Sequence, residues 1–496
     1  MEDVADMLVY GPEFRAMDEN MQWLTLDVIK ALPRPTVSTA APLASAAAAR
    51  APADFIDRIS RLPGELLRNI VSRLPAKDAA RTTALAKRWR RVWHSVPFVL
   101  VDAHLLSGTG VLGRDRSPYR GTGMEAMVSG LFRMVDGPFH LTDTVSHVLA
   151  AHPGPFGFVY LIGTNMETLQ DRAARWLPLL AAKGLKELVF VNLAMKLEDK
   201  VRLPTDLFKC TSLTKLYIGS WWLPDTADLP RTAAFPYLRE LGLCNLIMNH
   251  KDLIFLLDRC PVLEKLLITR SRLPVCIRIQ SRSLRSVQVS VAAVPEITVV
   301  NAPRLERLLL WEAWGWGDRD LTNMSCKVKI GHTPKLRILG FLVPGMHQLE
   351  IGNRVIKSEN DDLKFRGPQD KVNIKFWKEA GPIECVQKHI KKLVLRGFRG
   401  RKRELDFLKF VAEHAQVLQE VVIEMTYGYL PSDNLGVKLR IFMASAKWAN
   451  ECCKMMAVKC PFDQEATAWC YPRGFDFSIE DPFDVSKCQE DKCGAH

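Results

Sequence analysis

A spacing of leucines recurs along most of the chain and strongly limits what it can fold into. The hexamer that begins at Leu185 reads Leu-Lys-Glu-Leu-Val-Phe, with apolar residues at its first, fourth and sixth positions. From Leu185 to Leu336 this pattern begins anew every 21 to 31 residues. The recurrences are Leu213-Leu216-Ile218, Leu238-Leu241-Leu243, Leu263-Leu266-Ile268, Leu284-Val287-Val289, Leu305-Leu308-Leu310, Leu336-Leu339-Phe341, Ile390-Leu393-Leu395 and Leu418-Val421-Ile423. A period in this range indicates a solenoid, in which one short structural unit is stacked many times.

The pattern and its period are those of leucine-rich repeats, in which each unit is a strand followed by a connecting segment, often helical. Stacking buries a continuous core, and each Leu or Ile so buried contributes roughly 1.5–3 kcal/mol. The residues between the leucines are then expected on the exposed concave face of a curved parallel sheet, where a target protein could bind. The candidate target-binding residues are Lys215, Tyr217, Glu240, Lys265, Gln288, Arg307 and Trp311. For any single position, a solvated residue without a binding role is the competing interpretation.

Residues 62–97 form a second distinctive stretch. Its first half carries apolar residues at positions 62, 66, 67, 70, 71 and 74, which is helical spacing with one broad apolar stripe. Pro63 stands in the first turn, where a helix tolerates proline, and Pro75 ends the segment. The second half places Leu85, Trp89 and Trp93 on one face. Helices this short are marginal alone, so a partner is expected to cover their apolar surface.

This stretch resembles the F-box in its plant form, which opens with Leu-Pro and closes with Lys-Arg-Trp-Arg-x-x-Trp. Here the opening is Leu62-Pro63 and the closing run is Lys87 to Trp93, with a mild departure at Ala84-Leu85-Ala86. The resemblance implies docking on the Skp-type linker subunit of a cullin–RING ubiquitin ligase, whereas an ordinary helical hairpin would belong to a larger core. The implied linker contacts are Leu62, Pro63, Leu66, Leu67, Ile70, Leu74, Pro75 and Trp89.

A third segment, Cys385 to Glu424, predicts a strand, a Gly-Phe-Arg-Gly turn, a helix and a second strand. It resembles the FBD module that follows leucine-rich repeats in plant F-box proteins. Taken together, residues 54 to 425 resemble the large plant F-box/LRR/FBD family, its grass members especially.

The expected fold is α/β, with all-α F-box helices followed by a leucine-rich-repeat solenoid with a curved parallel sheet. Residues 1–53 are rich in Ala, Pro, Ser and Thr towards their end and are expected to form a flexible leader. The remaining predicted segments are the F-box at 54–97, the solenoid at 98–350, an irregular insertion at 351–384, an FBD-like terminal repeat at 385–425, and a C-terminal helix and tail at 426–496. The helix is expected over 439–456, and the tail is expected to be partly disordered.

Charge and cysteine content bear on two other possibilities, nucleic-acid binding and metal binding. The net charge of +13 permits attraction to nucleic acid, and basic residues cluster at 81–91 and 388–403. Neither cluster interleaves with the aromatic residues of a single-strand-binding surface, so a solvated basic face is favoured. The twelve cysteines contain no pair of Cys-x2-Cys motifs, which predicts reduced thiols and no metal site.

No motif of a phosphate-binding loop, a serine hydrolase or a zinc protease is present, and Gly108 to Gly113 is predicted to be a loop. The leading hypothesis is therefore a non-catalytic adaptor without a cofactor, which holds a target protein near a ubiquitin ligase. A leucine-rich scaffold that binds protein or nucleic acid outside a ligase is the alternative, and an enzyme with an unrecognised site is a third. Glu2, Asp3 and Asp6 stand where a signal peptide needs positive charge, so an intracellular protein of the nucleus or cytoplasm is expected.

Overall fold

The computed structural model describes most of the chain, in several segments. The chain folds into two compact units. The described residues are 28–33, 59, 61–74, 76–105, 138–162, 170–192, 201–226, 229–230, 232–271, 274–314, 326–343, 347–351, 354–356, 384–396, 398, 400, 402–425, 433–459 and 471–483. The first unit comprises residues 1–238 and 484–496, and the second comprises residues 239–483.

The first unit begins with three short helices that share one small core. They are α4 (Gly64–Ser72), α5 (Ala76–Thr82) and α6 (Lys87–Ser95). The residues that pack together between them are Leu67, Val71, Ala79, Trp89, Val92 and Val96. The predicted apolar stripe therefore does bring these helices together.

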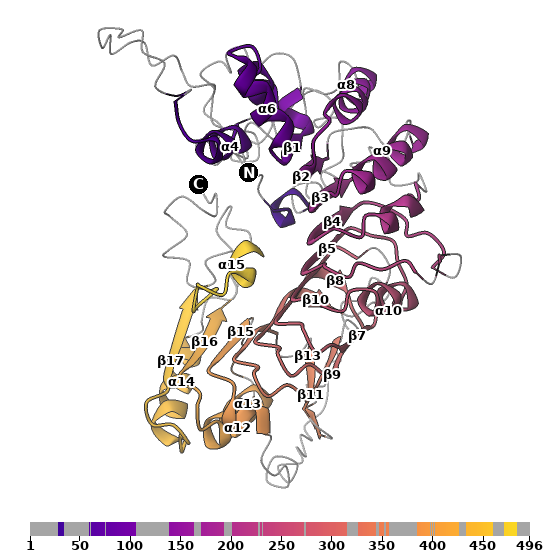
Figure 1. Ribbon diagram of the computed structural model, residues 1–496. Helices are drawn as coiled ribbons and strands as arrows, with labels where there is room; N and C mark the ends of the chain where they lie inside the picture. Colours follow the sequence, from indigo (N-terminus) through magenta and orange to yellow (C-terminus); the bar gives the residue numbers. More distant parts are fainter. Residues whose placement is uncertain are drawn as a thin grey trace, which may run out of the picture. The chain divides into compact units, whose positions relative to one another are not determined.

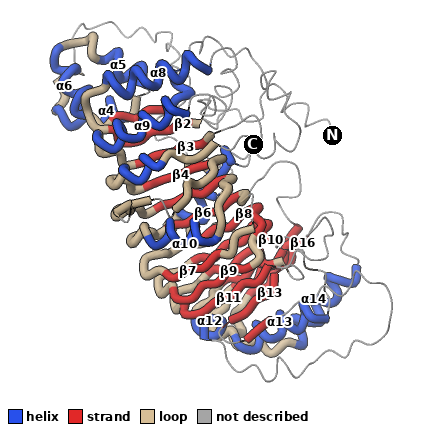
Figure 2. The backbone as a smooth tube through the Cα atoms, turned by 90° about the vertical axis from the view of Figure 1, so that its right-hand side faces the viewer, coloured by secondary structure: helices blue, strands red, loops and turns tan. Residues whose placement is uncertain are grey.

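Four parallel strands follow in the first unit, in the order β1-β2-β3-β4. The elements are β1 (Phe98–Val101), η2 (Asp102–Leu105), α8 (Pro138–Ala151), β2 (Phe156–Leu161), α9 (Gln170–Ala182), β3 (Glu187–Val191), η4 (Thr205–Lys209) and β4 (Lys215–Gly219). Helices α8 and α9 lie side by side (Figure 2), joined by a hydrogen bond of 2.9 Å from the Trp176 indole to Ser146 Oγ. Gly184 ends the turn after α9 with a φ of +66°, which a residue with a Cβ adopts at a cost.

The second unit contains the remaining strands of the repeat sheet, all parallel (Figure 1). In order they are β5 (Glu240–Cys244), β6 (Lys265–Thr269), β8 (Ser286–Ala293), β10 (Arg307–Trp314), β12 (Ile338–Leu342), β15 (Lys392–Arg396), β16 (Glu420–Met425) and β17 (Lys454–Lys459). The leucines of the recurring pattern are buried beneath these strands, as the pattern predicts. The solenoid sheet expected from the sequence is confirmed.

The connecting segments of the second unit differ from one repeat to the next. Helices α10 (His250–Asp258), α12 (Glu384–Lys388), α13 (Lys402–His414) and α14 (Asp433–Ser445) form some of them. Others form a second sheet in the order β14 (Arg354–Ile356), β13 (His347–Ile351), β11 (Cys326–His332), β9 (Glu296–Asn301) and β7 (Ile277–Gln280). Asn249 starts α10 with a capping box, because its side chain accepts from the amide of Asp252 and the Asp252 carboxylate accepts from the Asn249 amide.

Three expectations for the ends of the chain are corrected. Residues 28–31 are helical, and Val28 and Leu32 are buried, so this part of the expected leader is ordered; the rest of 1–53 lies outside the described residues. The expected helix over 439–456 ends instead at Ser445, and β17 follows at Lys454–Lys459. Within the tail, which is expected to be partly disordered, residues 471–483 are ordered and begin with a short helix, α15 (Tyr471–Phe475).

Candidate interaction surfaces

Apolar side chains remain uncovered on the three-helix cluster of the first unit. Leu66 and Ile70 are 50% and 39% exposed, although they belong to the apolar stripe of α4. Pro63 is also exposed, and its spacing from Leu66 and Ile70 places the three along one side of the helix. We call Pro63, Leu66 and Ile70 the α4 patch. Leu85, in the turn between α5 and α6, is 67% exposed as well.

The other residues predicted to contact a linker lie elsewhere. Leu67 and Trp89 are 0% and 3% exposed and form the core of the helical cluster, so the structure corrects their assignment from contact to core residues. Leu62 and Leu74 are half-buried and pack against that core. Pro75 lies outside the described residues.

Three cations of the 81–91 cluster make contacts within the helical cluster. The Arg88 guanidinium donates to the Leu62 carbonyl at 2.7 Å, and Arg90 Nε donates to the Thr83 carbonyl at 3.2 Å. Arg81 pairs with Asp78 at 2.9 Å on the surface of α5. Three of the basic residues at 81–91 therefore form contacts inside the helical cluster, which weakens the case that they form a surface for nucleic acid.

An aromatic junction joins the helical cluster to the first strand of the repeats. The Trp93 ring meets the Phe98 and His152 rings at centroid distances of 5.0 and 4.8 Å, and Phe98 stacks on His152 at 4.5 Å. Burial lowers the pKa of His152, so the ring is held neutral; it accepts a hydrogen bond from the Gly154 amide at 3.2 Å. Because His152 lies at the end of α8 and Phe98 in β1, this junction fixes the helical cluster against the first repeat.

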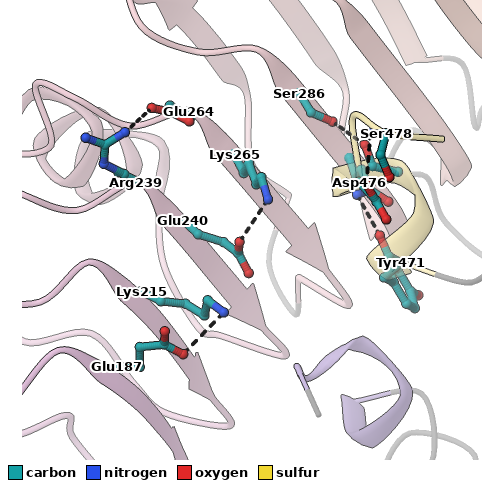
Figure 3. Close-up of polar contacts among 12 residues, drawn as sticks. Glu187, Lys215, Arg239, Glu240, Glu264, Lys265, Ser286, Tyr471, Asp476 and Ser478 are labelled. Carbon is teal, nitrogen blue, oxygen red and sulfur yellow. Dashed lines mark hydrogen bonds and ion pairs between the residues drawn. The ribbon is translucent and has the colours of Figure 1, made fainter. Parts of the chain in front are cut away.

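The strand residues predicted to bind a target fall into two groups, and those of the first group are partly exposed. Lys215 pairs with Glu187 at 3.2 Å in the first unit, and Lys265 pairs with Glu240 at 3.3 Å in the second (Figure 3). Their charged groups sit on the side of the strands that faces away from the leucine core.

The second group is buried, which contradicts the expected exposure. The buried members are Tyr217, Gln288, Arg307 and Trp311. Trp311 packs against Phe341 at 4.6 Å and lies under the Arg396 guanidinium at 4.3 Å. Arg307 is fully buried in β10; burial, together with the nearby Arg337, lowers its pKa to about 10, so it remains a cation at neutral pH.

Residues Tyr471–Phe483, which we call the C-terminal segment, cover Gln288 and Arg307. Gln288 Nε2 donates to the Tyr471 carbonyl at 3.0 Å, and the Arg307 guanidinium donates to the Gly474 carbonyl at 3.2 Å. The sequence interpretation missed this segment. Its four aromatic residues within a short span, unusual for a disordered tail, were the available signal.

The 388–403 cluster is likewise engaged within the second unit. Lys392 is nearly buried and pairs with Glu420 at 2.8 Å and with Asp481 at 2.7 Å. Arg396 lies over Trp311. Two of the cations in this cluster therefore serve internal contacts.

The described part of the chain holds no candidate metal site, and several of its thiols are deeply buried. No group of three His, Cys, Asp or Glu residues there could hold a metal ion. Burial raises the pKa of the Cys210, Cys260 and Cys326 thiols to about 12, which keeps them protonated and unreactive at neutral pH. None of the described helices is long and apolar enough to cross a bilayer.

Comparison with known protein families finds three matches along the chain. A model described as the F-box domain matches residues 59–100, a model of the LRR repeats of FBD-associated F-box protein At5g56370 matches residues 173–366, and a model described as FBD matches residues 378–423. The first match spans the α4 patch and its core, and the second spans most of the repeat strands.

Individual relatives come from Arabidopsis thaliana. F-box/LRR-repeat protein At3g26922 is 29% identical over 44% of this chain and 61% of its own length, and F-box/FBD/LRR-repeat protein At1g13570 is 29% identical over 42% and 43%. FBD-associated F-box protein At5g56370 is 32% identical over 43% and 44%. The chain thus spans about half the length of the curated relatives it matches. From its helical cluster, its repeats and these matches, the chain belongs to the F-box/FBD/LRR-repeat protein family of plants.

Proposed function

We propose that the protein is a non-catalytic substrate-recognition adaptor of a Skp–cullin–F-box ubiquitin ligase. The observation that carries the proposal is the α4 patch: apolar side chains stay exposed on helices whose own core is already complete. Exposed apolar residues on a small helical domain favour a protein partner. The F-box match makes the Skp-type linker the natural one.

The mechanism would be proximity. The α4 patch docks on the linker, and the repeats hold a target protein beside the ligase's catalytic module, which raises the effective concentration of target lysines there. The aromatic junction of Trp93, Phe98 and His152 supports this role, because a fixed attachment of the helical cluster to the first repeat transmits a defined position. We place the complex in the nucleus or cytoplasm.

The repeat residues that remain partly exposed are the better candidates for target contact. They are Lys215, Glu240 and Lys265. In each unit, a Lys–Glu pair leaves charges of both signs on the strand surface, which suits a polar protein partner.

Binding of purified full-length protein to a plant Skp-type linker, measured by calorimetry, tests the proposal. The variant Leu66→Ser/Ile70→Ser should weaken binding by about 2–4 kcal/mol, since central apolar anchors dominate such interfaces. Val437→Ser/Ile441→Ser is the matched control: these residues of α14 are 44% and 62% exposed and have the same spacing on a helix. The control should bind as the wild type does.

Absence of linker binding by the wild type would overturn the proposal and favour a leucine-rich scaffold outside a ligase. In that case nucleic-acid binding should be measured at several salt concentrations, because phosphate contacts produce an affinity that falls steeply with salt. Equal loss of linker binding in both double variants would show that the α4 patch is not the docking site.

A further inference from the structure

The C-terminal segment is held by side chains that donate hydrogen bonds to its main-chain carbonyls. The Arg307 guanidinium donates to the carbonyls of Arg473, Gly474 and Asp476 at 3.1, 3.2 and 3.0 Å, and also to that of Ile479. These carbonyls lie within and just after α15, where the helix dipole places partial negative charge. A buried cation from β10 therefore recognises a turn of backbone.

Strand β8 adds two more contacts to main-chain carbonyls and one to a side chain. Ser286 Oγ donates to the Gly474 carbonyl at 3.0 Å and Gln288 Nε2 to the Tyr471 carbonyl at 3.0 Å, while Ser290 Oγ meets the Tyr471 hydroxyl at 2.9 Å. Figure 3 shows Ser286 reaching towards the helical turn that begins at Tyr471. All three serve polar, directional contacts on a face where the sequence predicts solvent.

The far end of the segment is fixed by its side chains. The Asp481 carboxylate pairs with Lys392 at 2.7 Å. The Phe483 ring meets Phe341 at 4.6 Å and lies so close to Gly340 that a Cβ there would be 2.1 Å from the ring. The Phe483 ring therefore occupies a space on β12 that exists because residue 340 is a glycine.

Charge is complementary across this contact. Arg285 lies over the Phe477 ring at 3.7 Å, and Lys265 lies over the Phe475 ring at 5.7 Å. The segment in turn carries one basic residue against three acidic residues, Asp476, Glu480 and Asp481. We call the residues that receive it the socket: Ser286, Gln288, Ser290, Arg307, Gly340 and Lys392.

The strands that carry the socket are also held by contacts that do not involve the segment. Its polar residues alternate along β8 and β10 with Val287, Val289 and Leu308, which are buried in the leucine core on the opposite face. The strands are also paired to their neighbours through continuous registers. We therefore expect removal of the segment to uncover the socket's polar side chains and to leave the sheet beneath them intact.

We propose that the socket is a peptide-binding site, filled here by the chain's own C-terminal segment, and that a protein segment of the same chemistry competes for it. That chemistry is a short helical turn with exposed carbonyls, aromatic residues on either side and an acidic residue before the last aromatic. Main-chain recognition supplies affinity, and the Ser290, Lys392 and Gly340 positions supply selectivity. This site goes beyond linker docking and does not depend on it.

Competition in the full-length chain tests the proposal. A fluorescently labelled peptide of residues 471–483 is titrated against wild type and against Asp481→Asn/Phe483→Ala, which weakens the covalent segment and leaves the socket unchanged. The peptide should bind the variant at least about tenfold more tightly, because the attached segment of the wild type competes at a high effective concentration. Glu480→Gln, which changes an exposed carboxylate next to Asp481, should behave as the wild type.

Adding Arg307→Met to the weakened variant should remove peptide binding again, and a peptide carrying the same two changes should bind at least about tenfold more weakly. Equal peptide binding by wild type and by a folded Asp481→Asn/Phe483→Ala variant, or none by either, would overturn the proposal.

Hydrogen exchange on the wild type keeps the test decisive if that variant does not fold. Amides of 471–483 should exchange through local opening while those of β8 and β10 remain protected, and excess peptide should accelerate their exchange. If the segment opens only together with β8 and β10, it is an integral part of the fold and the socket is not an exchangeable site.

Discussion

The helical cluster of the first unit and the socket of the second are built in opposite ways. On α4 the apolar residues Leu66 and Ile70 are exposed, while on β10 a charged residue, Arg307, is completely buried. Each departs from the usual rule that apolar residues are inside and charged residues outside. The difference lies in what covers each surface: the socket is covered by the same chain, whereas the α4 patch stays exposed, and we propose that a linker subunit covers it.

This comparison separates residues that maintain a surface from residues that present it. Trp89 and Leu67 support the α4 patch from beneath, as Val287 and Leu308 support the socket. Changes in the supporting residues should affect folding, and changes in the presented residues should affect binding.

The largest effect is expected for Trp89→Ala. This side chain fills the core of the three-helix cluster, and its loss should destabilise the cluster by about 3–5 kcal/mol, which is enough to unfold it. Hydrogen exchange of residues 64–95 measures the effect. Leu66→Ala should leave the same amides protected; equal loss of protection in both variants would mean that the two sides of α4 are not distinct.

Arg307→Met should destabilise the second unit by about 1.5–3 kcal/mol, because four carbonyls of the C-terminal segment, two of them in fully buried contacts, lose a charged donor. Denaturant unfolding followed by exchange in β8 and β10 measures this. Arg239→Met is the control: its pair with Glu264 is exposed, and its loss should cost at most about 1 kcal/mol. A similar cost for both would contradict the role assigned to the buried cation.

The two regions also show how far the sequence could be interpreted. The Leu-x-x-Leu-x-Leu spacing located the strands correctly, since β5 and β6 begin two residues after Leu238 and Leu263 and bury the predicted side. It could not show that Gln288 is covered, because the covering residue, Tyr471, is 183 positions away. Local periodicity contains no information about such a contact.

A different limit applies to α4. Leu66 and Leu67 are both apolar and adjacent, so they point about 100° apart around the helix, and a broad apolar stripe contains both directions. The sequence therefore predicted a single docking face that includes both residues. In the structure, Leu67 faces the internal core of the helical cluster and Leu66 faces outward. Only the positions of α5 and α6 decide between them.

A smaller effect is expected for Gly340→Ala, which tests how closely the segment is fitted. The added methyl group would meet the Phe483 ring, and overpacking of this kind costs about 1–3 kcal/mol. Exchange of residues 471–483 should rise while β12 remains protected. Gly64→Ala, where the nearest atom is the end of the Arg68 side chain at 3.7 Å, should be tolerated. Unchanged exchange of the segment would show that Phe483 is not held against β12.

The smallest effect is expected for pH at the aromatic junction. Burial lowers the pKa of His152 in the folded chain, whereas in the unfolded chain the pKa of this imidazole is about 6.5. Between these two values the unfolded state binds more protons, so the stability of the junction is complete above about pH 6.5 and falls as the pH is lowered through that window. Lys183, which donates to the His152 carbonyl, adds a further positive charge that disfavours the protonated ring.

Thermal unfolding at pH 8 and pH 5.5 measures this dependence, with His152→Gln as the comparison. The variant is expected to be less stable at pH 8, because it loses the stacking on Phe98, but to lose less stability on acidification than the wild type does. Arg307 of the socket remains charged throughout this range and does not contribute to the slope. Identical pH slopes for wild type and variant would mean that His152 is not the titrating group.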